Sequence, residues 1–290
     1  MKLLYLDNNV LIYLFEKRDA RQVAAYDELR KNAHRLVFSM TTIIEVCQSH
    51  SQDQALALAT YIDDADACWL DWYLDVQRAE FQTFLARSFF KEKQVVAYTP
   101  VRARLGDLFA GLDDAQRATI SASWLVQQMW RNNEAMKFGE RHEQHAAVVA
   151  ELQDNVARGA VTSMVDMIAL NNYLVFRLPE RPPDGKPLSI DDKREMIAFS
   201  LRNRNILFQQ CPSIAAEYYL SDYRTANPDR VPKRSDSQDL MFSCVALPYV
   251  HYLVTNDRYL RTGLEHVAAK LDGIHCQVYR HLWEVAEEHG

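Results

Sequence analysis

The chain has 290 residues, of which 48% are hydrophobic, so it is long enough for one large domain or two modest cores. Its formal net charge of −6 excludes the broad positive field of a protein that grips nucleic acid with its whole surface. The five cysteines are widely spaced and form no CxxC pair, which argues against a disulfide framework or a zinc site and predicts buried thiols.

The N-terminal segment is apolar but is interrupted by Asp7, Asn8 and Asn9, and no small-residue cleavage site follows it. No uninterrupted apolar run approaches the roughly 18 residues that a membrane span needs. We therefore expect a soluble, cytoplasmic protein without a membrane partner.

The first ninety or so residues alternate short apolar runs with segments of helical periodicity. The opening run ends in Asp7, and Asn8 or Asn9 can cap the helix that follows. The predicted strands are residues 2–7, 35–39 and 68–73, and the predicted helices are residues 10–15, 21–32, 41–49, 54–62 and 76–90.

The middle of the chain, residues 94–227, has helical periodicity and almost no strand signal. Its predicted helices are residues 113–130, 134–157, 161–176, 190–210 and 214–224, with a proline-rich loop at 178–187. The alternation returns at the end, with helices at 235–247 and 259–271 and strands at 251–255 and 275–279.

This pattern predicts an α/β fold with a central parallel sheet flanked by helices and a large all-α insertion. The first half of the core is expected at residues 1–93, the helical insertion at 94–228, and the second half of the core at 229–290.

Four acidic residues stand out by their positions relative to the predicted strands. Asp7 ends the first strand and Asp257 follows the strand at 251–255, so both belong to the sheet edge where α/β proteins bind ligands. Glu45 lies on the helix after the second strand, and Asp239 lies near the start of the helix before the Asp257 strand.

Carboxylates that converge repel one another and tolerate this only with a cation between them. Oxygen ligands suit Mg²⁺ or Mn²⁺, and such an ion can activate water and stabilise charge on a phosphodiester. The four acids are therefore candidate metal ligands and candidate catalytic residues for phosphodiester hydrolysis.

Four short motifs in this order resemble those of PIN-domain proteins. The matching residues are Asp7 with Asn9, Ser39 with Glu45, Asp239, and Thr255 with Asp257, the last aspartate lying 18 positions after Asp239. The resemblance covers roughly residues 1–90 and 230–290. It implies a Mg²⁺- or Mn²⁺-dependent ribonuclease, often a toxin or an RNA-processing factor, in which Asn9, Ser39 and Thr255 support the metal site.

Two features depart from the family pattern. The chain carries over a hundred inserted residues where PIN domains are usually compact, so the substrate class cannot be transferred from the family. In addition, Asn8 stands where the family usually has Thr or Ser. The insertion is a candidate cover for the site, a candidate surface for a protein inhibitor or other partner, and a candidate homodimer interface.

Each of the four acids also has a purely structural interpretation: a helix cap for Asp7, a capping box with Thr42 for Glu45, a capping box with Asp236 for Asp239, and a plain loop acid for Asp257. Asp236 is either a helix cap or an outer metal ligand.

Three arginines, Arg234, Arg258 and Arg261, flank the acidic motifs and are candidate contacts to nucleic-acid phosphates, although ordinary surface charge explains them equally well. RNA is the expected partner. The alternative to a nuclease is a non-catalytic PIN-like module that binds protein or RNA and uses the insertion as its interaction surface.

Overall fold

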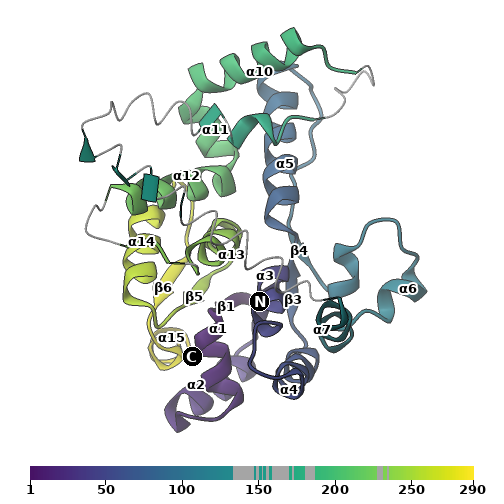
Figure 1. The fold of residues 1–290 in the computed structure, drawn as a ribbon, viewed down its shortest axis with the longest axis vertical. Helices are drawn as coiled ribbons and strands as arrows, with labels where there is room; N and C mark the ends of the chain where they lie inside the picture. The colour runs from purple at the N-terminus through teal and green to yellow at the C-terminus, as the bar shows by residue number, and fades with distance from the viewer. Residues whose placement is uncertain are drawn as a thin grey trace.

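A six-stranded sheet connects the two ends of the chain (Figure 1). The computed structural model of the protein describes residues 1–132, 147, 150–151, 153–154, 157–158, 170–171, 173–179, 187–226, 231–233 and 235–290. The strands are β1 (Lys2–Leu6), β2 (His34–Ser39), β3 (Cys68–Leu70), β4 (Val101–Arg102), β5 (Tyr252–Val254) and β6 (Gln277–Tyr279). Their order in the sheet is β4-β3-β2-β1-β5-β6.

Five of the six strands are parallel, and β4 pairs antiparallel with β3 at one edge. In the central strand, Leu4 pairs with Leu36 on β2 and with Tyr252 on β5. The expectation of an α/β fold with a mainly parallel sheet is therefore confirmed.

Strand β1 is apolar from Leu3 to Leu6 because both of its faces are covered there. Leu3 and Tyr5 face one hydrophobic core, whereas Leu4 and Leu6 face the other. Strands buried on both faces have the continuous apolar character that marked this segment in the sequence.

Two groups of helices cover the two faces of the sheet (Figure 1). The core under Leu4 and Leu6 is built with α1 (Asn8–Phe15), α2 (Ala20–Lys31), α3 (Met40–Val46), α4 (Gln52–Asp63), α7 (Ala122–Arg131) and α15 (Leu282–His289). The core under Leu3 and Tyr5 is built with α5 (Tyr73–Phe84), α10 (Ile190–Arg202), α11 (Arg204–Gln210), α12 (Pro212–Thr225), α13 (Asp236–Tyr249) and α14 (Arg258–Ala268).

The middle of the chain differs from the expected run of helices. Strand β4 lies within it, and two residues are too few to give a periodic signal in the sequence. Helix α7 packs against α3 and α4, while α10, α11 and α12 belong to the opposite core, so the described part of this segment contributes to both faces of the sheet.

Several helix boundaries also differ from the sequence expectations. The helix expected at 113–130 is two helices, α6 (Asp114–Ala118) and α7. The helix expected at 190–210 divides at Asn203, whose side-chain Nδ2 donates to the carbonyl of Phe199 and ends α10. Helix α5 is followed by a π-helical turn at Leu85–Phe89. The helices expected at 134–157 and 161–176 and the loop at 178–187 lie mostly outside the described residues.

Helices α12 and α14 approach each other closely at Gly263. A Cβ atom at this position would lie 3.1 Å from Leu220 Cδ1 and 3.1 Å from Tyr223 Cδ1, both on α12. The absence of a side chain therefore allows the close contact between these two helices.

Among the residues that the structure describes, no helix has the length and apolar character needed to cross a membrane.

Candidate acidic site at the carboxyl edge of the sheet

The direction of winding of the sheet changes beside β1. From β1 the chain proceeds to β2 and β3 on one side, and it later returns to β5 and β6 on the other. The carboxyl ends of β1 and β5 therefore lie next to each other, and the backbone N–H of Asp7 donates to the carbonyl of Val254 at 2.9 Å. Parallel α/β sheets bind ligands at such a switch point.

Asp7 is buried directly after β1, at the N-cap position of α1. Its side chain makes no capping hydrogen bond to that helix, so the cap interpretation does not account for the carboxylate. Instead, Asp7 Oδ2 accepts a hydrogen bond of 2.8 Å from the hydroxyl of the buried Thr255. Burial raises the pKa of Asp7, the Thr255 hydrogen bond opposes this, and the charge of Asp257 adds to the rise.

Asp257 is the N-cap of α14. Its Oδ1 accepts from the backbone N–H of Leu260 at 2.8 Å, and its own N–H donates to Thr255 Oγ1 at 3.2 Å. Asp257 is thus a capping residue rather than a plain loop acid, and Thr255 links it to Asp7.

Glu45 lies near the C-terminal end of α3. The N-cap of this helix is Ser39, whose backbone N–H donates to Thr42 Oγ1 at 3.4 Å, so Glu45 does not close a capping box with Thr42. Burial raises the pKa of Glu45 well above its usual value, and the charges of Asp7 and Asp239 add to the effect. No hydrogen bond or ion pair to the Glu45 side chain occurs among the described residues.

Asp239 lies in the first turns of α13, whose N-cap is Ser235 rather than Asp236, so Asp239 does not close a capping box with Asp236. Its Oδ2 lies 3.5 Å from the guanidinium Nη2 of Arg224, which is buried on α12. Burial raises the pKa of Asp239 to about 7, against the opposing charge of Arg224 and with the help of the charges of Asp7, Asp236 and Asp257.

The four predicted acids therefore share one electrostatic environment, because Asp7, Glu45 and Asp239 each have a pKa raised by another member of the set. Their oxygen atoms are of the kind that Mg²⁺ and Mn²⁺ prefer. However, within the described ranges no three His, Cys, Asp or Glu side chains are arranged so that they could hold one ion. The carboxylate oxygens are suitable ligands for a divalent cation, but the four side chains are not arranged to coordinate one ion.

The predicted supporting residues differ in burial and in their hydrogen bonds. Thr255 contacts Asp7, as described above, whereas Asn9 is exposed on α1. Ser39 is buried at the end of β2 and bonds to Tyr5. Asp236 is buried at the start of α13, and its Oδ2 accepts from the backbone N–H of Lys233 at 2.8 Å, which closes the turn before this helix, whose N-cap is Ser235.

The basic candidates do not contact the acids in the described part of the chain. Arg234 lies outside the described residues. Arg258 is exposed at the first position of α14, and Arg261 pairs with Glu265 of the same helix at 3.6 Å.

Tyr5 lies beside the acids and was missed in the sequence analysis. Its hydroxyl is 3.0 Å from Ser39 Oγ and 3.3 Å from Thr42 Oγ1, and its ring stacks on Phe242. Burial, followed by the charge of Glu45, raises its pKa. The signal was present, since Tyr5 precedes Asp7 by two positions on a buried strand and a buried tyrosine hydroxyl needs a partner.

A further acid, Asp71, follows β3 at the same edge of the sheet. Its carboxylate accepts from Arg102 Nε at 2.9 Å and also from the hydroxyl of Tyr98. The charge of Asp71 is therefore balanced by Arg102 rather than by a ligand of the acidic site.

Comparisons with known proteins add no relative to this description: no family model matches the sequence, and searches of curated proteins and of solved structures found no match.

Proposed function

We propose that the protein is a divalent-metal-dependent nuclease with a PIN-like core, which hydrolyses phosphodiester bonds in RNA at Asp7, Glu45, Asp239 and Asp257. The observation that carries the proposal is the gathering of these acids at the switch point of the sheet, where the charges of neighbouring acids raise the pKa of Asp7, Glu45 and Asp239. A cation bound among the acids would stabilise their ionised forms.

In this proposal, Asp7 and Asp239 are the central ligands of Mg²⁺ or Mn²⁺, and Glu45 and Asp257 complete the set. When bound, the ion would lower the pKa of a water molecule and stabilise charge on the phosphate. Thr255 orients the Asp7 carboxylate through its hydrogen bond, and Asp257 or Asp239 orients the attacking water.

The test is cleavage of single-stranded and structured RNA in Mn²⁺, in Mg²⁺ and in EDTA. We expect metal-dependent cleavage by the wild-type protein and a loss of about a hundredfold or more in Asp7→Asn, because removing one preorganised charged group commonly costs that much. Asp53→Asn, at an exposed position in the first turn of α4, is the control. Equal cleavage by wild type and Asp7→Asn would contradict the proposal, as would no cleavage in any condition.

The second candidate is a non-catalytic module that binds protein or RNA. The ion pair between Arg224 and Asp239 favours it, because one of the four acids already has a resident partner. A melting temperature unchanged by Mn²⁺, together with RNA binding but no cleavage, would support this alternative.

A further inference from the structure

Arg224 reaches the acidic site from the last turn of α12. It is 3% exposed, its Nη1 donates to the backbone carbonyl of Asp236, and its Nη2 lies 3.5 Å from Asp239 Oδ2. The carbonyl of Arg224 accepts from Gln153 Nε2 at 3.1 Å, so both its backbone and its side chain are held. The sequence alone gave no reason to associate this arginine with the acids.

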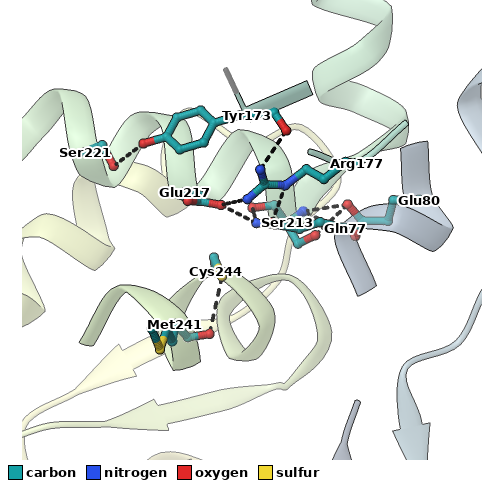
Figure 2. A network of polar contacts seen from close by, with 9 residues as sticks. All are labelled: Gln77, Glu80, Tyr173, Arg177, Ser213, Glu217, Ser221, Met241 and Cys244. Carbon is teal, nitrogen blue, oxygen red and sulfur yellow. Dashed lines mark hydrogen bonds and ion pairs between the residues drawn. The ribbon is translucent and has the colours of Figure 1, made fainter. Parts of the chain in front are cut away.

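Buried polar contacts hold the preceding turns of α12 against α5 and the segment 173–179 (Figure 2). Glu217 forms an ion pair of 2.9 Å with Arg177. One turn earlier, the backbone N–H and hydroxyl of Ser213 donate to the carboxylate of Glu80 at 3.1 and 2.6 Å. Ser213, Glu217 and Arg224 lie on one face of α12, with Arg224 two turns after Glu217, so these contacts fix the place from which Arg224 extends.

Arg224 is the one cation in ion-pair contact with any of the four acids among the described residues. A guanidinium remains charged at any pH at which the protein is folded, so its charge cannot be removed by deprotonation. A divalent ion that binds Asp239 must therefore approach a fixed positive charge, and this repulsion weakens its binding.

We infer that Arg224 is a resident cation of the acidic site: it occupies the Asp239 side, weakens divalent-metal binding and restricts the site to one ion. This inference rests on the proposed metal site. It also explains why the four acids are not arranged to coordinate one ion: the Asp239 carboxylate is paired with Arg224 on the side of α12.

Calorimetric titration of the metal-free chain with Mn²⁺ tests the inference without relying on activity. We expect the wild-type protein to bind one Mn²⁺ ion per chain. Arg224→Gln should bind Mn²⁺ about tenfold or more tightly, since it removes a neighbouring positive charge, and Arg224→Lys should remain within about threefold of wild type. Arg35→Gln is the control, because Arg35 pairs with Asp66 at the amino end of β2.

Far-ultraviolet circular dichroism in EDTA verifies that each variant is folded. If Arg224→Gln does not fold, the number of Mn²⁺ ions bound per wild-type chain still tests the inference. Two ions per chain in the wild type would overturn the inference, as would equal affinities of wild type and Arg224→Gln, while the proposed metal site would stand. Tighter binding of Mn²⁺ by Arg224→Gln than by the wild type, which binds one ion, would support the inference. Absence of binding in every variant would overturn both the inference and the metal site.

Discussion

The hydroxyl of Thr255 donates a hydrogen bond of 2.8 Å to Asp7 Oδ2, and this contact joins residues 248 positions apart in the chain. Both side chains are buried, and each follows a strand of the neighbouring pair β1 and β5. The candidate site therefore exists only when the two ends of the chain have paired in the sheet.

Replacing Thr255 by valine tests this contact. Thr255→Val keeps the shape of the side chain but removes the hydroxyl that donates to the buried Asp7 carboxylate, so we expect a loss of about 1–3 kcal/mol in the free energy of unfolding. Urea denaturation at neutral pH measures the loss. The matched control is Thr262→Val, since Thr262 is exposed on α14, and it should stay within about 0.5 kcal/mol of wild type.

Glu45→Gln should stabilise the metal-free protein. The substitution removes a buried acid whose pKa is raised by burial and by the charges of Asp7 and Asp239. A gain of about 1 kcal/mol would raise the melting temperature by roughly 2–4 °C, measured in EDTA at pH 8. Glu195→Gln, at an exposed position of α10, should leave the melting temperature unchanged. A lower melting temperature for Glu45→Gln would argue against crowding of the acids.

Glu80 should make the protein less stable as the pH rises. Burial raises its pKa to about 7 from a usual value of 4.5, despite hydrogen bonds from Ser213, which Figure 2 shows, and from Tyr249. The folded state therefore binds the proton more tightly than the unfolded state. The stability from Glu80 is full below about pH 4.5 and is lost as the pH rises through about 7.

The pH dependence of Glu80→Gln isolates this contribution from that of the acidic site. Between pH 5 and 7, its unfolding free energy should fall less steeply than that of wild type, by up to about 1.4 kcal/mol per pH unit. Urea titrations at four or five pH values measure both slopes. Identical slopes would show that Glu80 ionises normally in the folded protein.

Breaking the buried ion pair of Arg177 and Glu217 should be costly. Arg177→Met leaves the Glu217 carboxylate buried without its cation, which is expected to destabilise the fold by about 3–5 kcal/mol. The exposed pair of Arg194 and Asp191 provides the comparison, and Arg194→Gln should cost less than about 1 kcal/mol. Similar losses in the two variants, measured by urea denaturation, would contradict the assigned importance of the buried pair.

Much of the sheet could be predicted from the sequence because β1, β2, β3 and β5 are largely buried and therefore apolar. The apolar run ending at Asp7 marked β1, and similar runs marked β2, β3, β5 and β6 within a few residues of their observed bounds. In contrast, β4 consists of only Val101 and Arg102, which is too short to give a pattern. Its pairing depends on contact with β3 rather than on its own composition.

Site residues that directly follow a strand could be predicted from the sequence. Residues that reach the site through the packing of helices could not. Asp7 and Thr255 could be placed at one edge because parallel strands end at the same side of a sheet. Arg224 could not, since it reaches Asp239 through the packing of α12 on α13, and nothing in the local sequence specifies that packing. Tyr5 could be placed near Asp7 from its position on β1, but its hydroxyl partners could not be predicted, because they come from another strand and helix.

The close contact of α12 and α14 at Gly263 has a consequence for evolution. Helix α14 begins beside Asp257 and α12 ends beside Arg224, so a larger residue at position 263 would move two parts of the acidic site apart. Descendants of this sequence should therefore keep glycine at this position. Where they exchange it for alanine, we expect smaller side chains at positions 220 or 223 to have been selected with it.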